Sequence, residues 1–128
     1  MLLLLLAFPA AAVAAAPAAT TTAASGVTRS AAALNGTVDP NGKATSYHFE
    51  YGTTTAYGLT SAGGDAGAGE DPVAVSVPVA GLSAGTTYHY RIVASNEDGD
   101  VTGADRTFRT ASGPALPGIT STAAREVG

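Results

Sequence analysis

The sequence predicts an all-β protein, a seven-stranded antiparallel sandwich of two sheets. Apolar and polar residues alternate in several runs after residue 20, which is the period of a half-buried strand. Turn-forming residues separate these runs, and no segment after residue 20 has the apolar stripe of an amphipathic helix. Seven short strands in about 90 residues favour a sandwich over a barrel. We expect these strands at 20–28, 31–39, 45–52, 56–61, 73–80, 86–96 and 102–110.

The first half of the chain contains a clear turn and a clear alternating strand. The strand at 31–39 ends in the sequence Asp39-Pro40-Asn41-Gly42, where Pro and Asn-Gly together predict a reverse turn. The strand at 45–52 places aromatic residues on one face and polar residues on the other. The aromatic residues are Tyr47, Phe49 and Tyr51.

Glycine and proline shape the middle of the chain. Gly63–Gly69 reads GGDAGAG, and we expect a flexible loop that packs against nothing. In the strand at 73–80, valines alternate with smaller residues. Pro78 has no N–H to donate, so this strand is expected at a sheet edge or at a bulge.

The last two strands, 86–96 and 102–110, flank Asp98-Gly99, a dipeptide that suits a hairpin turn. Tyrosine and isoleucine alternate with polar residues in the first of them. The strands together predict a core of large apolar side chains: Val27, Leu34, Val38, Tyr47, Phe49, Tyr51, Val75, Val77, Leu82, Tyr88, Tyr90, Ile92 and Phe108.

The two ends of the chain differ in composition from the middle. Residues 1–19 combine a short apolar run with small residues, as a secretory signal does, and the run is too short to span a bilayer. Ala12 and Ala14 fit an A-x-A cleavage rule, and Ala19 offers a later site. No Lys or Arg precedes the apolar run, so an uncleaved amino-terminal anchor is the alternative. We expect no stable membrane span after cleavage.

Residues 111–128 are predicted to be a linker and the start of a second repeat. Pro17–Val27 and Pro117–Val127 are identical at six of eleven positions without a gap, at an offset of 100 residues. Similarity at a fixed offset is typical of tandem modules, and the offset matches one small sandwich. Chance similarity between two Ala- and Thr-rich segments is the alternative.

Composition excludes several classes of function. The net charge of −4 argues against a nucleic-acid partner, which would require a basic face. The absence of cysteine excludes disulfides, thiolate metal ligands and a cysteine nucleophile. No G-x-S-x-G elbow, no acidic residue within an apolar run and no phosphate-binding glycine loop is present. We therefore predict that the chain is not an enzyme, needs no cofactor and holds no metal.

Three segments carry a resemblance to the fibronectin type III family. Leu82–Ala94 resembles the family's penultimate strand, Thr45–Gly52 its third strand, and Leu34–Gly42 its second strand and turn. The resemblance covers residues 20–110 and implies an immunoglobulin-like sandwich. Within the family, these segments are similar to tandem modules of exported bacterial proteins. Many members bury a tryptophan where this chain has Leu34, so the core must be filled differently.

The spacing of Leu82 and Tyr88 suggests a tyrosine corner. In such a corner the ring is buried and its hydroxyl bonds to the upstream backbone, which fixes the crossover between the sheets. We expect Tyr88 to have this structural role. Leu82, Leu34, Tyr47, Phe49 and Tyr90 are expected to be structural core residues.

Few residues remain as candidates for surface binding. His48 and His89 are expected on neighbouring strands with both side chains on the outer face, but two imidazoles are too few for a zinc site. Arg91 is placed to pair there with Glu50. Tyr57 is the one tyrosine outside the predicted core. The acidic stretch 96–100 departs from the spacing of a calcium loop and is predicted to be a plain turn.

The resulting expectation is a secreted or cell-surface, non-catalytic module that acts as a spacer, scaffold or adhesion unit in a tandem array. Its partners would be neighbouring modules of the same polypeptide. One alternative is a module that binds cell-wall polysaccharide or a surface protein, through exposed aromatic residues such as Tyr57. The other is an accessory domain of an exported hydrolase whose catalytic residues lie elsewhere.

Overall fold

The computed structural model describes residues 15–112, and these residues form nine β-strands. Within this range, no helix is long and apolar enough to cross a membrane. The strands are β1 (Ala18–Ser25), β2 (Ala31–Asp39), β3 (Thr45–Gly52), β4 (Leu59–Thr60), β5 (Gly64–Gly67), β6 (Val73–Ala80), β7 (Thr87–Asn96), β8 (Gly99–Thr102) and β9 (Arg106–Arg109).

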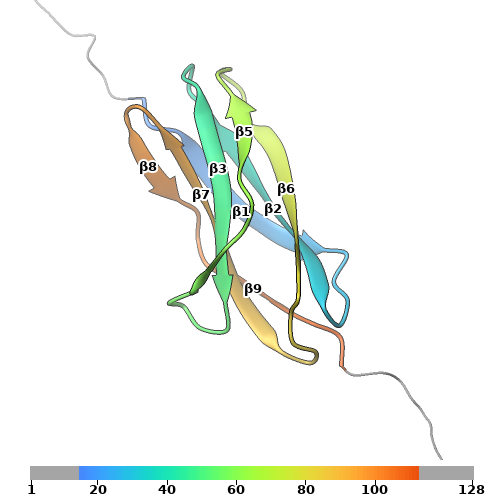
Figure 1. Ribbon diagram of the computed structural model, residues 1–128. Coiled ribbons are helices and arrows are strands. Elements are labelled where there is room, and N and C mark those ends of the chain that lie inside the picture. The colour runs from blue at the N-terminus through green and yellow to red at the C-terminus, as the bar shows by residue number, and fades with distance from the viewer. Residues whose placement is uncertain (1–14, 113–128) are drawn as a thin grey trace, which may run out of the picture.

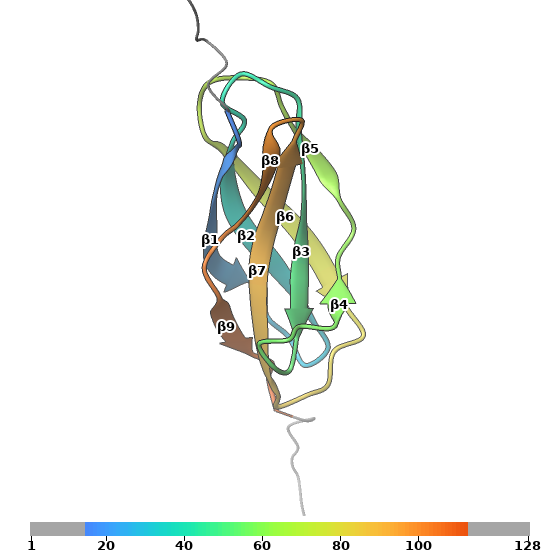
Figure 2. The ribbon, with the colours of Figure 1, turned by 90° about the vertical axis from the view of Figure 1, so that its left-hand side faces the viewer.

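The strands form two antiparallel sheets that lie face to face (Figure 1 and Figure 2). The three-stranded sheet has the order β1-β2-β6. The six-stranded sheet has the order β4-β3-β7-β8, with β5 also paired to β3 and β9 also paired to β7. The chain crosses between the sheets after β2, after β5 and after β6. The predicted all-β, immunoglobulin-like sandwich is confirmed, with two more strands than expected.

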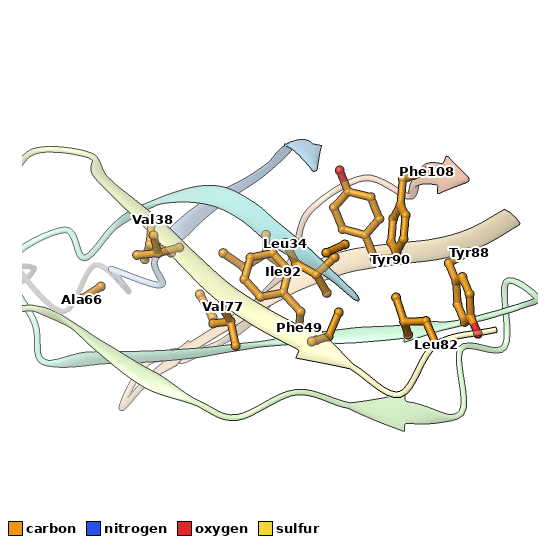
Figure 3. Close-up of a cluster of buried hydrophobic side chains, with 14 residues drawn as sticks. Leu34, Val38, Phe49, Ala66, Val77, Leu82, Tyr88, Tyr90, Ile92 and Phe108 are labelled. Carbon is orange, nitrogen blue, oxygen red and sulfur yellow. The ribbon is translucent and has the colours of Figure 1, made fainter. Parts of the chain in front are cut away.

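The core fills the space between the sheets, where alternate residues of facing strands meet (Figure 3). Leu34, Phe49, Tyr90 and Ile92 have no exposed surface. Leu34 therefore lies on the inner face of β2, where many fibronectin type III modules have a tryptophan. Aromatic rings from β3 and β7 fill the volume that a tryptophan would take. Three predicted core residues are only half-buried and pack at the edge of the core: Val27, Tyr47 and Tyr51.

Three predicted strands have the bounds expected from alternation, namely β2, β3 and β6. β6 is an edge strand, as the proline predicts, with Pro78 opposite Ala33 of β2. The strand predicted at 56–61 is much shorter, because only Leu59 and Thr60 pair with β3.

The glycine-rich segment is not a free loop, so that prediction is wrong. Residues Gly64–Gly67 form β5, which pairs with β3. Ala66 is buried in the core, and Gly64 lies against the Tyr47 ring so closely that a side chain there would collide with it. The glycines are used here for close approach of backbone to an aromatic ring, which composition alone does not reveal.

The prediction of a single strand at 102–110 is also wrong, because this segment divides into β8 and β9. Both strands pair with β7, but the register of β9 is shifted by one residue from that of β8: Val93 pairs with Thr102, whereas Tyr90 pairs with Arg106. At the break, Gly103 donates its N–H to the Ile92 carbonyl at 2.8 Å. The Ile92 N–H is bound instead by the Thr21 hydroxyl of β1, at 3.3 Å. A side chain of β1 thus binds the backbone of β7 at the point where the six-stranded sheet is interrupted between β8 and β9.

Tyr88 stands at the crossover from β6 to β7, with its ring buried and its hydroxyl bonded to the upstream backbone. The hydroxyl oxygen accepts a hydrogen bond from the Ser83 N–H at 2.9 Å. The ring stacks on Phe108 with centroids 5.6 Å apart. The buried Thr110 hydroxyl donates to the Ser83 carbonyl at 2.6 Å and completes the corner. Thr110 lacks an apolar side chain, so the sequence pattern did not identify it.

The described chain enters the sandwich at one end and leaves at the other (Figure 1 and Figure 2). β7 connects the two ends. At its carboxyl end, the Asn96 side chain donates to the Ala15 carbonyl at 2.7 Å. Just before its amino end, the Gly85 N–H donates to the Ala111 carbonyl at 2.8 Å. A ten-residue strand spans about 30 Å, so this distance separates entry from exit.

Candidate functional site

The outer face of the six-stranded sheet carries a connected group of polar and aromatic side chains, which we name the Tyr57 cluster. β3, β7, the loop between β3 and β4 and the turn before β9 each contribute to it. Its members are Glu50, Tyr57, His89, Arg91 and Asp105.

The register of β3 and β7 creates the centre of the cluster. Glu50 lies directly opposite Arg91, and the Arg91 Nε donates to Glu50 Oε1 at 2.8 Å. Side chains at directly opposed positions of an antiparallel pair lie close enough to interact. The sequence predicted this pair, and the structure confirms it.

The loop after β3 folds back over the strand and places Tyr57 above Arg91. The Arg91 guanidinium carbon is 4.6 Å from the centroid of the Tyr57 ring, which is cation–π geometry. Tyr57 has φ of 61°, a left-handed conformation that costs roughly 1 kcal/mol or more for a residue other than glycine. The surrounding contacts therefore hold this backbone in place.

Asp105 connects Tyr57 to His89. The Tyr57 hydroxyl donates to Asp105 Oδ1 at 2.9 Å, and His89 Nδ1 lies 3.0 Å from Asp105 Oδ2. Partial desolvation opposes ionisation of Asp105, but hydrogen bonds from His89 and Tyr57 outweigh it and lower the pKa of this carboxyl. Desolvation, and then the hydrogen bond to Asp105, raise the pKa of the Tyr57 hydroxyl.

The side chains of the cluster bind one another through hydrogen bonds and ion pairs, and none is placed as a general acid. Glu50 accepts a hydrogen bond from Arg91, and the hydrogen bonds that Asp105 accepts stabilise its ionised form. A general acid would require the opposite, a carboxyl whose protonated form is favoured by burial. Across residues 15–112, no group of three or more potential ligand side chains is placed to hold a metal ion.

The two histidines do not form a joint site. Both are on the outer face, as expected, but His48 is opposite Val93 whereas His89 is opposite Gly52. Four residues along the strand separate these positions, which is about 13 Å. The Glu50–Arg91 pair lies between them. His89 belongs to the Tyr57 cluster, and His48 is separate from it.

The acidic hairpin between β7 and β8 lies at the end where the chain enters. Lys43 Nζ contacts Glu97 Oε2 at 2.8 Å and Asp98 Oδ2 at 3.3 Å. Lys43 and Glu97 also line a surface hollow with Gly42. Asp105 lies in the Tyr57 cluster instead, so the acidic residues of this region do not converge.

Solved structures similar to this chain come from bacterial and human proteins. The sensor domain of the anti-sigma factor RsgI4 of Pseudobacteroides cellulosolvens matches with a TM-score of 0.59 and 19% identity, over 75% of this chain and 95% of that one. A solution structure of the same domain gives 0.59 and 17%, over 80% and 91%. The third fibronectin III domain of human KIAA0343 protein gives 0.43 and 11%, over 88% and 98%.

Comparison with protein-family models finds no match, and comparison with curated proteins finds none. At these identities the structural neighbours establish the fold alone. The fold that they share with this chain is an antiparallel β-sandwich of two sheets.

Proposed function

We propose that the chain is a non-catalytic, exported module that holds its neighbours apart in a tandem array. The observation that carries this proposal is the placement of entry and exit at opposite ends of the sandwich. A module of this shape adds about 30 Å to an array, because β7 runs from one end to the other. Neighbouring modules would be its partners, and the cell surface or the secreted fraction its location.

Burial along β1 supports the interpretation of residues 117–127 as the start of a second module. Five positions differ between Pro17–Val27 and Pro117–Val127: Ala18, Ser25 and Gly26 are exposed, Ala19 is half-buried and becomes Ile119, and Thr21 is buried. The buried hydroxyl of Thr21 is replaced by the hydroxyl residue Ser121, and the half-buried Val27 by an identical residue.

The coding sequence that follows residue 128 tests the array. We expect further units of about 100 residues, each with the pattern of the first strand and of the tyrosine corner. Small-angle scattering on proteins with one and two units should give a maximum dimension that grows by about 30 Å per unit. A catalytic domain in place of a repeat, or two units folded side by side, would contradict the proposal.

The Tyr57 cluster favours a second candidate function, recognition of a polysaccharide or a protein surface. A strained, half-buried tyrosine stacked on Arg91 is the type of feature that occurs at binding sites. The similar fold in Pseudobacteroides cellulosolvens is described as a sensor domain. Co-sedimentation with purified peptidoglycan tests this function. Binding that Tyr57→Ala abolishes and His48→Ala preserves supports it, and absence of binding contradicts it for that polymer.

A further inference from the structure

The first described residues are held by side chains from two turns at the entry end. The Ala15 N–H donates to Asp98 Oδ2 at 3.0 Å. The Ala15 carbonyl accepts from Asn96 Nδ2 at 2.7 Å, and the Ala16 carbonyl accepts from Asn41 Nδ2 at 2.7 Å. These bonds fix two residues that precede β1 and belong to no strand.

We propose that export processing cuts the chain between Ala14 and Ala15, and that the new α-ammonium group of Ala15 binds the Asp98 carboxylate. This inference rests on the proposed export. A signal peptidase would hydrolyse the Ala14–Ala15 peptide bond with one water molecule. The water oxygen bonds to the Ala14 carbonyl carbon and the C–N bond breaks, which leaves a carboxylate on Ala14, and both protons of the water end on the Ala15 nitrogen to give the ammonium. The nitrogen that becomes the ammonium is the atom that already lies beside Asp98.

The other small-residue sites fit the fold less well. Cleavage after Ala19 would remove the first two residues of β1, which pair with Asp39 and Val38 of β2. It would also remove Pro17, which is buried. Cleavage after Ala16 would remove the residues whose carbonyls are bound by Asn96 and Asn41. Cleavage after Ala14 preserves every one of these contacts.

The charges around Ala15 suit a cation. Asp98 and Glu97 come from the β7–β8 turn, and Lys43 comes from the chain before β3. The hydrogen bond from the Ala15 nitrogen is the main cause that lowers the pKa of Asp98, and Lys43 adds to it. With an ammonium at Ala15, two cations face two carboxylates, since Lys43 is closer to Glu97 than to Asp98. The uncleaved chain has one cation there for two carboxylates.

The first experiment determines the amino terminus. The full 128-residue chain is produced in a bacterium with an active secretory pathway, and the exported protein is analysed by intact mass and by amino-terminal sequencing. We expect Ala15 as the first residue. Export with cleavage at another residue, such as Pro17 or Thr20 as the new terminus, would overturn this inference and leave export standing. An uncut chain that remains in the cytoplasm would overturn both.

The second experiment tests the ammonium–carboxylate contact in the mature chain of residues 15–128. Four proteins are compared by thermal unfolding at pH 7: free or acetylated at the Ala15 nitrogen, each with Asp98 or with Asp98→Asn. Acetylation keeps the N–H and removes the charge. We expect acetylation to lower the Tm by about 2 °C with Asp98 present and to have no effect with Asp98→Asn. Equal effects in both backgrounds would overturn the contact.

Discussion

The backbone carbonyl of Tyr57 lies directly over the α-carbon of Gly52, with no space between them for a side chain. Gly52 is the last residue of β3, and Tyr57 is the residue that caps Arg91 on the outer face. The absence of a β-carbon at this position therefore lets the loop after β3 close over the sheet. The placement of Tyr57 in the cluster depends on this one close approach.

Gly52→Ala should destabilise the protein and displace Tyr57 from the cluster. A methyl group at residue 52 would have to push the loop outward, and overpacking of this kind costs about 1–3 kcal/mol. The free energy of unfolding in urea measures the loss. Gly69→Ala is the matched control, because a β-carbon there would meet nothing within 4 Å. Similar stability of the two variants would show that the loop has room to move.

Thr21→Val should destabilise the sandwich although the two side chains are nearly the same size. The Thr21 hydroxyl accepts the Ile92 N–H at the point where neither β8 nor β9 pairs with β7. Valine leaves that buried donor without a partner, at a cost of about 1–3 kcal/mol. Urea unfolding measures the change, with the exposed Thr20→Val on the same strand as control. Amide exchange at Ile92 should accelerate in Thr21→Val alone, and an unchanged rate would contradict the role of Thr21.

Tyr88→Phe should lower the free energy of unfolding by about 1 kcal/mol. The variant keeps the stacking on Phe108 and removes only the oxygen that accepts the Ser83 N–H. Chemical denaturation measures the effect. Tyr51→Phe is the comparison, because within residues 15–112 no hydrogen bond involves its hydroxyl. Unchanged denaturation of Tyr88→Phe would refute the corner as a stabilising element.

The two sheets were predictable because several of their strands show local alternation of apolar and polar residues. β2 buries every second residue and β6 does so from Val75 onward, and in β3 the aromatic residues alternate with polar ones, so the bounds of these strands follow from side-chain type. The Glu50–Arg91 pair followed from the same alternation on neighbouring strands. β5 did not, because it is a glycine strand whose position depends on the Tyr47 ring.

The Tyr57 cluster was only partly predictable, because a one-residue register shift between β8 and β9 determines on which face of the sheet the Asp105 side chain lies. An uninterrupted strand after the β7–β8 hairpin would place Asp105 opposite Tyr90, on the inner face. The one-residue shift at Gly103 instead puts Phe108 opposite Tyr88 in the core. It also turns Asp105 outward toward His89. A shift of one residue reverses every side chain beyond it, and no local signal in the sequence gives its position.

Asp105 should make the stability of the protein depend on pH in the acid range. Its pKa is lowered in the folded state, so the unfolded chain binds the proton more tightly, with a pKa of about 3.9. The stabilisation is therefore complete above about pH 4 and is lost as the pH falls through the lower folded pKa.

Urea unfolding of the wild type and of Asp105→Asn between pH 2 and pH 7 measures this dependence. We expect the difference in unfolding free energy to be constant near neutral pH and to shrink below about pH 4, where the wild-type carboxyl becomes protonated. Asp71→Asn removes an equal charge from an exposed loop position, so it controls for net charge. A difference that stays constant down to pH 2, or that Asp71→Asn reproduces, would mean that the hydrogen bonds from His89 and Tyr57 do not favour the ionised carboxylate.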